Sequence, residues 1–322
     1  MSANTESDTA DAQPATTPDV EPDNDIEPEI EDEPEVEPDP ESEDEVERES
    51  EAEEEAGVEK EEVEDAETVT KSPPQQFQAA IKGGEIKQFV GTLRAVVDEA
   101  KIQVGPDGIH TRAVDPANVA MYDVALAAGA FESYDATDGV LGLNLERFAE
   151  VLKLAKKDDL VQLSFNTTSF KLAIHIDGVE FTMALIDPDS IRPEPDLPEM
   201  DLPISLTLEE AQFARGVKAA DMVSDHISFR CDESEATVYV EAEGDTDDIN
   251  LKLTEDDLSE LTAVDGQALY SLDYIEDISK QFPKGAEITL LFGSDFPMMF
   301  DYEFSEGECE ALAMVAPRIQ TD

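Results

Sequence analysis

The chain has 322 residues, of which 80 are acidic and 21 basic, and its formal net charge is −59. No stretch approaches the roughly 20 apolar residues of a membrane span, and no charged-then-apolar leader begins the chain, so neither membrane insertion nor export is expected. The two cysteines, Cys231 and Cys309, are far apart in sequence and are expected to be reduced thiols on strands.

Residues 1–76 are predicted to form a disordered acidic extension. The first aromatic residue is Phe77, and stretches such as 27–44 repeat acid, proline and small residues. Such a segment cannot bury enough apolar surface to offset the entropic cost of ordering. We expect it to act as a solubility or steric appendage. The remaining residues are apolar enough and numerous enough for one or two cores.

The negative charge is spread over the extension and the remainder alike. One interpretation is a soluble protein from a cytoplasm of very high salt, whose dense carboxylates keep the surface hydrated. The other is a ligand for basic partners. Lysine is scarce and acidic residues occur in every loop, which favours the first interpretation. A single basic partner would need only a local acidic surface.

Apolar spacing predicts an α+β first half. A strand at 77–81 precedes a helix at about 85–100, and a second helix is expected at 145–156. The predicted strands between and after them are 101–104, 109–114, 121–126, 140–145, 160–165, 170–176 and 179–186.

Residues 184–203 read ALIDPDSIRPEPDLPEMDLP and are predicted to be a surface linker. Proline lacks an amide donor and fixes φ, so this stretch cannot form a helix or a central strand. Ile191, Leu197 and Leu202 interrupt it and need an apolar surface beneath them. We therefore expect a linker that docks onto one of the halves it joins.

The same plan then restarts. Helices are expected at about 208–223 and 272–282, and strands at 204–208, 227–231, 237–241, 249–253, 287–292, 299–304 and 310–315. Core positions of the second helices and of the strands after them match the first half at an offset of 127, as in Leu145/Leu272 and Val161/Ile288. The first helices match at an offset of 124, as in Phe89/Phe213. A constant offset indicates duplication of a supersecondary unit.

Basic residues recur on the predicted helices. Arg94 matches Lys218 at the offset of 124, and Lys153 matches Lys280 at 127. A single helix lysine is as often an ordinary solvated side chain. Repetition on four helices favours a common basic surface.

The motifs RAVDPANV (112–119), ALIDPDSIRPEPDLP (184–198), AADMVSDH (219–226), EGDTDD (243–248) and APRI (316–319) occur in this order. Together they resemble the sliding clamps of archaea and eukaryotes, the PCNA family, most of all those of extreme halophilic archaea. The resemblance implies a DNA-clamp fold with domains at 77–187 and 204–322, a connecting linker at 188–203, helices on one concave face and antiparallel sheets outside. It does not cover residues 1–76.

The resemblance implies a clamp rather than an enzyme. Three copies of the chain would close head to tail around double-stranded DNA, without sequence preference. DNA polymerase, clamp loader, flap endonuclease and ligase would dock through short peptide motifs, in the cytoplasm at the nucleoid. No cofactor, metal or membrane is implied.

The resemblance also assigns three groups of residues. The DNA-facing cations would be Lys87, Arg94, Lys153, Arg215, Lys218 and Lys280. The partner-peptide pocket would be formed by Val114, Val119, Met121, Ile191, Leu197, Pro198, Pro297, Met314 and Pro317. The subunit interface would involve Ile176, Val179, Phe181, Met183, Ile249, Leu251 and Leu253.

The sequence departs from the family at two places. Residues 313–315 lack the aromatic side chains common there, so Met314 would make that wall of the pocket more pliable. Glu150 stands where relatives often carry lysine, which thins the positive lining. His110, His175 and His226 are isolated in sequence and suggest structural roles. The alternative function is an acidic chaperone that binds basic partners through its extension.

Overall fold

The computed structural model describes residues 72–198 and 200–318, which belong to one compact unit, Glu64–Asp322. The predicted extension lies outside the described residues as far as Lys71. Its last five residues, 72–76, are not disordered as predicted: Pro74 is buried, and the carbonyl of Ser72 accepts from the amide of Val140 at 2.9 Å. Over the described part, the elements of the first half are β1 (Phe77–Lys82), α1 (Gly83–Arg94), β2 (Glu99–Gly105), β3 (Gly108–Val114), β4 (Ala120–Ala127), β5 (Ser133–Ala136), β6 (Gly139–Asn144), α2 (Leu145–Leu152), β7 (Leu160–Asn166), β8 (Lys171–Ile176) and β9 (Val179–Ala184).

The second half repeats this order. Its elements are β10 (Ile204–Glu209), α3 (Glu210–Ala220), β11 (His226–Asp232), β12 (Thr237–Glu243), β13 (Asp248–Leu253), β14 (Glu260–Thr262), β15 (Gly266–Ser271), α4 (Leu272–Ser279), β16 (Glu287–Phe292), β17 (Met298–Phe304) and β18 (Cys309–Val315). The fold is α+β, as predicted, and the two cysteines are free, buried thiols on β11 and β18.

The strands form three antiparallel sheets. The five-stranded sheet has the order β5-β1-β7-β8-β9, and the four-stranded sheet has the order β13-β12-β11-β15. The nine-stranded sheet, β14-β10-β16-β17-β18-β4-β3-β2-β6, crosses from one half to the other where β18 pairs with β4. Backbone hydrogen bonds therefore join the halves into one continuous sheet.

The duplication has a single register, which corrects the sequence-based offset of 124 for the first helices. The elements β1, α1, β2, β6, α2 and β7 each begin 127 residues before β10, α3, β11, β15, α4 and β16. Ile86, rather than Phe89, is thus the counterpart of Phe213, and Arg94 corresponds to Asp221, not to Lys218. A shift of three residues keeps the same helix face toward the core, so apolar spacing alone could not fix the register.

The helices are shorter than predicted. The helix expected to reach Ala100 ends at Arg94, and Ala100 lies on β2 opposite Leu143. α3 and α4 end three residues before their predicted C-termini and α2 ends four residues before, and α3 begins at Glu210 instead of 208. Val96, Ala155 and Phe282 are buried in the turns that follow, so tertiary packing, not helix continuation, explains these apolar residues.

Three strands were not predicted, namely β5, β14 and β15. β5 and β14 each end a sheet and carry no fully buried residue, so their sequences lack the apolar alternation of a core strand. β15 contains Gly266 and only two buried side chains.

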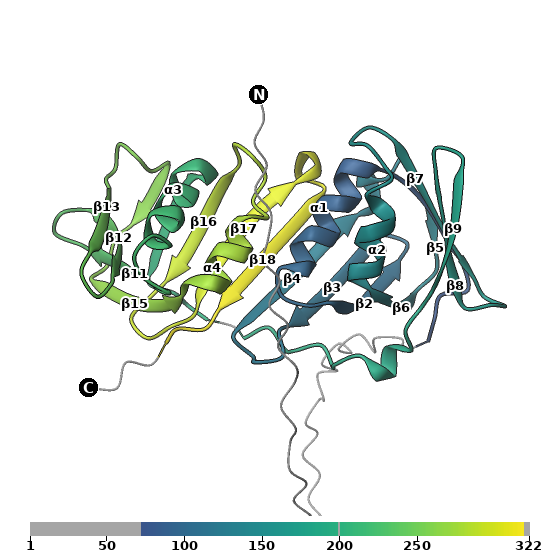
Figure 1. The fold of residues 1–322 in the computed structure, drawn as a ribbon, viewed down its shortest axis with the longest axis horizontal. Helices are drawn as coiled ribbons and strands as arrows, with labels where there is room; N and C mark the ends of the chain where they lie inside the picture. The colour runs from purple at the N-terminus through teal and green to yellow at the C-terminus, as the bar shows by residue number, and fades with distance from the viewer. Residues whose placement is uncertain (1–71, 199, 319–322) are drawn as a thin grey trace, which may run out of the picture. The chain divides into compact units, whose positions relative to one another are not determined.

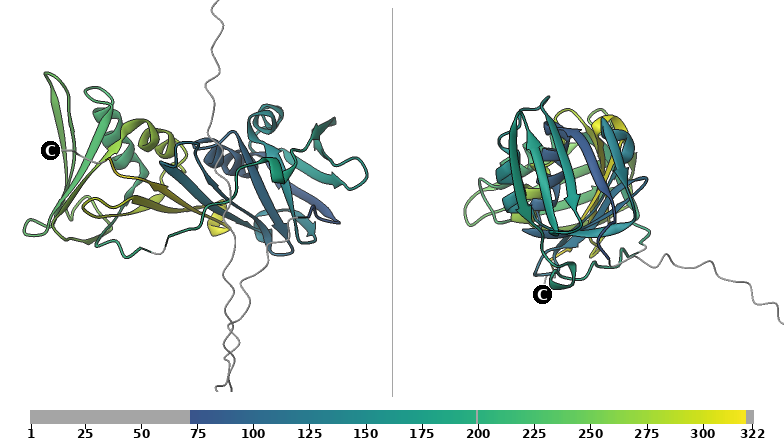
Figure 2. Two further views of the ribbon diagram at one scale, coloured as in Figure 1. Left: turned by 90° about the horizontal axis from the view of Figure 1, so that it is seen from below. Right: turned by 90° about the vertical axis from the view of Figure 1, so that its right-hand side faces the viewer.

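All four helices lie on one side of the strands, as Figures 1 and 2 show together. α1 packs beside α2, and α3 beside α4. The side-chain amide of Gln88 on α1 donates to the carbonyl of Gln281, just after α4, so the two helix pairs also meet. Between helices and sheets lies one apolar cluster with side chains from both halves, including Phe89, Tyr122, Phe213 and Phe300.

The linker docks onto the first half, as predicted. Ile191 is buried, and the backbone of Ile186 bridges to Gly142 on β6. The side chain of Gln103 donates to Glu194 at 2.6 Å, and Arg112 donates to the carbonyl of Pro195 at 3.4 Å. The linker therefore follows the outer side of β2, β3 and β6, opposite the helices.

Candidate functional site

The predicted DNA-facing cations all lie on or at the ends of the four helices. Arg94, Lys153, Arg215, Lys218 and Lys280 are exposed, whereas Lys87 is half-buried and its amine donates to the carbonyl of Ala155. Because the helices share one side of the strands, these side chains belong to one helical layer.

Acids on the same helices offset part of this charge. Lys280 pairs with Asp277 at 3.1 Å and with Glu276 at 3.2 Å. The hydrogen bond to Asp277 is the main cause of a raised pKa of Lys280. On α2, Glu150 pairs with Arg147 at 2.6 Å. The cations of this layer are thus sparse and partly paired with acids, which suits loose phosphate contacts and not tight binding.

The predicted pocket residues lie on the opposite side of the sheet, around its centre. Val114, Met121 and Met314 are register partners on β3, β4 and β18, so they stand in one row on one face. Met299 on β17 pairs with Met314 and extends this row. Sequence reasoning missed Met299, although its alternation with buried Met298 and Phe300 could have indicated an outward position.

The other predicted pocket residues come from three loops and from the linker. Val119 lies just before β4, Pro297 just before β17, and Pro317 just after β18. From the linker, Ile191 is buried, Leu197 is half-buried and Pro198 is exposed. Met121 and Met314 retain only 7% of their exposed area, whereas Val114 and Met299 are half-buried. The result is a methionine-rich apolar patch bordered by prolines, a suitable site for an apolar peptide anchor.

The predicted interface residues lie at the last strands of two sheets, β9 and β13. Phe181, Ile249 and Leu251 are partly buried, and Val179 retains 47% of its exposed area. Met183 and Leu253 are buried. Ile176 lies on β8, one strand in from the edge, and is buried under the helices, so it supports the edge from within.

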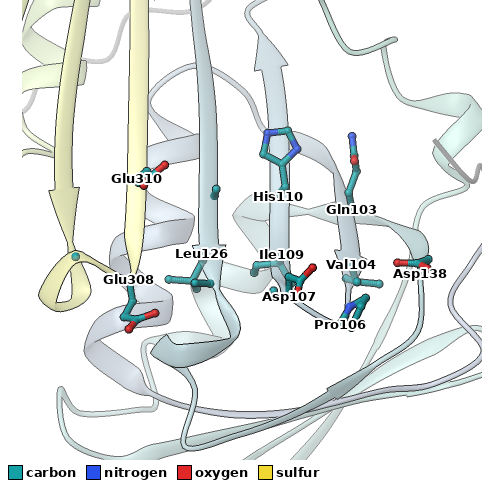
Figure 3. A pocket seen from close by; sticks show the side chains of 15 residues that line it. Gln103, Val104, Pro106, Asp107, Ile109, His110, Leu126, Asp138, Glu308 and Glu310 are labelled. Atoms are coloured by element: carbon teal, nitrogen blue, oxygen red, sulfur yellow. The ribbon is translucent and has the colours of Figure 1, made fainter. Parts of the chain in front are cut away.

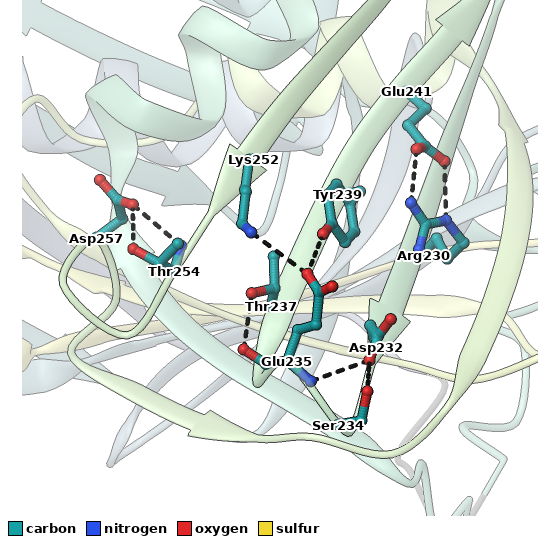
Figure 4. Close-up of polar contacts among 10 residues, drawn as sticks. All are labelled: Arg230, Asp232, Ser234, Glu235, Thr237, Tyr239, Glu241, Lys252, Thr254 and Asp257. Atoms are coloured by element: carbon teal, nitrogen blue, oxygen red, sulfur yellow. Dashed lines mark hydrogen bonds and ion pairs between the residues drawn. The ribbon is translucent and has the colours of Figure 1, made fainter.

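A polar network that was not predicted lies on the face of β11–β13 that points away from the helices (Figure 4). Arg230 pairs with Glu241 at 2.9 Å and stacks on the ring of Tyr239 at 4.0 Å. Glu235 accepts from Tyr239 at 2.7 Å and from Lys252 at 3.3 Å. These cross-strand contacts hold β13, the edge strand, to its sheet.

A hollow of about 470 Å³ lies where the β2–β3 turn approaches the β17–β18 turn (Figure 3). Asp107, Asp138, Glu308 and Glu310 line it. Among the described residues there is no group of three or more side chains placed to hold a metal ion. His110, on β3, is hydrogen-bonded to Asp123 on β4 at 2.6 Å. No helix of the described part is long and apolar enough to cross a membrane.

Comparison with known proteins agrees with this architecture. Residues 77–184 match the family model described as the N-terminal domain of proliferating cell nuclear antigen. The second half is built on the same plan, so the chain has the DNA-clamp fold. Proteins of this class catalyse no reaction.

The chain is similar along the whole length of named clamps. It is 45% identical to the DNA polymerase sliding clamp of Natronomonas pharaonis and 46% identical to that of Haloarcula marismortui, over 76% of this chain and 100% of each relative. A structure of the C-terminal region of FEN-1 bound to A. fulgidus PCNA matches with a TM-score of 0.72 and 32% identity, covering 76% of this chain and all of that one. The chain belongs to the DNA polymerase sliding clamps, the PCNA family. It is therefore a processivity factor and not an enzyme.

Proposed function

We propose that this protein encircles duplex DNA as a homotrimeric ring and tethers DNA polymerase and other replication and repair proteins to it. The observation that carries the proposal is the match along the full length of haloarchaeal sliding clamps. Its strongly negative charge is compatible with this role, because encirclement holds DNA by topology and needs little attraction. In molar salt, moreover, the Debye length is only about 3 Å.

The junction between the two halves supports head-to-tail closure. By the duplication, β18 corresponds to β9 and β4 corresponds to β13. The pairing of β18 with β4 inside the chain is therefore an internal model for β9 of one protomer pairing with β13 of the next. Such closure would leave no free edge at either strand.

The internal pairing also supplies a register. Ala311 opposes Val124 and Ala313 opposes Tyr122 at the junction. The pairing of Leu163 with Ile174 and of Ile174 with Phe181 repeats as Leu290 with Phe300 and Phe300 with Ala313, so Phe181 corresponds to Ala313 and Val179 to Ala311. Carried over with Tyr122 and Val124 shifted by 127, these pairs place Val179 opposite Leu251 and Phe181 opposite Ile249. All four side chains lie on the helix side of their sheets, where α2 and α3 flank the edges, so the interface would have an apolar layer beneath a backbone ladder.

We further propose that Lys87, Arg94, Lys153, Arg215, Lys218 and Lys280 face the DNA. Sparse cations at helix ends would contact phosphates without reading bases. The repeated pair Lys153 and Lys280, each at a helix C-cap, supports a lining shared by both halves.

Partners would dock at the methionine row. The FEN-1 segment bound to the A. fulgidus protein supports a flap endonuclease as one partner, and DNA polymerase, clamp loader and ligase are proposed through similar peptides. The proposed division is an extension at 1–76, domains at 77–187 and 204–322, and a linker at 188–203. The proposed location is the nucleoid in the cytoplasm.

Loading onto circular DNA tests the function. Clamp and clamp loader are incubated with nicked circular DNA in molar potassium chloride, and bound clamp is separated by gel filtration. We expect clamp to stay on the circle and to be lost when the circle is cut once. Equal retention on linear and circular DNA would contradict encirclement. Retention that requires residues 1–72 would favour the acidic chaperone instead.

A further inference from the structure

The turn between β3 and β4 is held by one buried carboxylate. Asp115 retains only 4% of its exposed area. Its Oδ1 accepts from the amides of Val119 at 2.6 Å and Ala120 at 2.8 Å, and its Oδ2 accepts from the amide of Ala117 at 2.9 Å. The side chain thus fixes the backbone of the whole turn.

A fourth donor comes from the second half of the chain. The hydroxyl of Tyr274, on α4, donates to Oδ2 of Asp115 at 2.8 Å, across 159 residues of sequence. Because α4 belongs to the helical layer, this bond joins that layer to the turn that borders the pocket.

The other walls of the pocket also attach to this turn. From the linker, Arg192 donates to the carbonyl of Asp115 at 2.8 Å and also to the side chain of Asn118. From the C-terminal segment, the amide of Ala316 donates to the carbonyl of Val119 at 2.7 Å. The linker, the methionine row and the C-terminal segment therefore take their relative positions from one five-residue turn, 115–119.

We propose that Asp115 is a positioning residue for the partner-peptide pocket, and that Tyr274 is the contact through which α4 fixes it. This inference rests on one part of the proposed function, the binding of partner peptides at this pocket. The carboxylate itself touches no ligand. It acts by fixing the turn that carries Val119, to which the linker attaches through Arg192 and the C-terminal segment through Ala316.

The charge state of Asp115 agrees with this role. Burial alone would raise its pKa, but the hydrogen bonds from Ala120, Ala117, Tyr274 and Val119 outweigh burial and lower the pKa below the ordinary 3.8. The group is therefore an acceptor-only carboxylate at neutral pH. Replacing it with an amide turns acceptor capacity into donors that face other donors, which is costly in a buried site.

Two variants test the inference. Asp115→Asn removes acceptors with little change of shape, and Tyr274→Phe removes only the hydroxyl. The control is Tyr239→Phe, which removes a hydroxyl bonded to Glu235 on a distant sheet. Each is titrated with a fluorescent FEN-1 C-terminal peptide in molar potassium chloride, alongside ring mass, thermal midpoint and amide exchange without peptide.

We expect peptide affinity to fall about tenfold in Asp115→Asn and about threefold in Tyr274→Phe, as loss of charge-assisted bonds implies. Affinity should be unchanged in the control. Without peptide, amides of residues 117–120 should exchange faster in Tyr274→Phe while ring mass and thermal midpoint stay the same.

Unchanged exchange at the turn in Tyr274→Phe would overturn the inference, as would wild-type affinity in both variants. If the wild-type ring binds no peptide, the proposed pocket fails, and exchange at the turn still decides whether Tyr274 holds it. If Asp115→Asn does not fold, Tyr274→Phe alone decides the outcome.

Discussion

The hydroxyl groups of Tyr122 and Tyr302 lie 3.1 Å apart in the core, where β4 of the first half and β17 of the second flank β18. Both rings are fully buried. The pair is therefore a polar contact between the halves inside an otherwise apolar cluster. Each hydroxyl satisfies the other, which makes the contact sensitive to loss of one partner.

Replacing both tyrosines of this pair should cost less than the two single replacements added together. Tyr122→Phe or Tyr302→Phe alone leaves a buried hydroxyl without this partner and should lower the free energy of unfolding by about 1–3 kcal/mol. The double variant should lose less than the sum of the single losses. Denaturant unfolding in molar potassium chloride measures this double-mutant cycle. Additive losses would show that the hydroxyls do not interact.

The same pair predicts alkaline behaviour. Burial raises the pKa of Tyr302 to about 12, and burial also raises that of Tyr122 well above 10. In the unfolded chain both groups deprotonate near pH 10, so the folded state holds more protons between pH 10 and 12. The free energy of unfolding should therefore be fully present below pH 10 and fall as pH rises toward 12. The fall should be smaller in the double phenylalanine variant, and equal falls would contradict the assignment.

Asp123 should stabilise the sheet next to the linker. Burial would raise its pKa, but hydrogen bonds from His110 and Arg112 lower it below 3.8. Its contribution is therefore present above the unfolded pKa and is lost as pH falls through the lower folded value. Asp123→Asn should reduce the free energy of unfolding at pH 7 by about 1–3 kcal/mol and by less at pH 3. Asp295→Asn, in the exposed turn before β17, is the control.

Lys153 and Lys280 should contribute unequally to DNA contact, although they occupy equivalent helix ends. Lys280 is paired with Asp277 and Glu276, whereas no ion pair within the described residues involves Lys153. Lys153→Ala should reduce the salt dependence of DNA binding by about 0.9 in log–log slope, the value for one phosphate contact. Lys280→Ala should change it less. The slope is measured on short duplexes between 50 and 200 mM salt, roughly the range in which such contacts are resolved.

The proposed register at the ring interface can be cross-linked. In Phe181→Cys/Ile249→Cys the new thiols should face each other across two protomers and give covalent trimers on oxidation, since β pairs place Cβ atoms at disulfide distance. Phe181→Cys/Leu251→Cys is the matched control, displaced by two residues. Denaturing electrophoresis measures the product. Stronger cross-linking of the control would show that the register is wrong.

The acidic extension should not be needed for assembly. Its charges are screened beyond about 3 Å in molar salt, so deleting residues 1–72 should leave the ring mass unchanged at 1 M potassium chloride. Light scattering checks this result. A monomer after the deletion would assign the extension a structural role.

Several features could be predicted from the sequence because they depend on local chemistry. Acid and proline content separated the extension, proline chemistry located the linker, and apolar periodicity identified four helices and most strands. Motif order identified the family. Each of these patterns can be read along the chain without knowledge of which residues are in contact.

Other features were decided only by tertiary structure. The repeat offset of 127 for the first helices follows from the strands that precede them, since β1 pairs with β7 as β10 pairs with β16. Apolar spacing alone could not fix this offset, because a helix shifted by three residues presents the same face. The ends of the helices followed from burial of Val96 and Phe282 in turns.

The sequence by itself determined that this is a duplicated acidic clamp with a docked linker, because composition and spacing act along the chain. It could not determine that Asp115 meets Tyr274, that Met299 joins Met314, or that β18 pairs with β4. Those contacts join residues 159, 15 and nearly 190 positions apart, and a hydrogen bond or a sheet register depends on positions in space that only the packed core fixes.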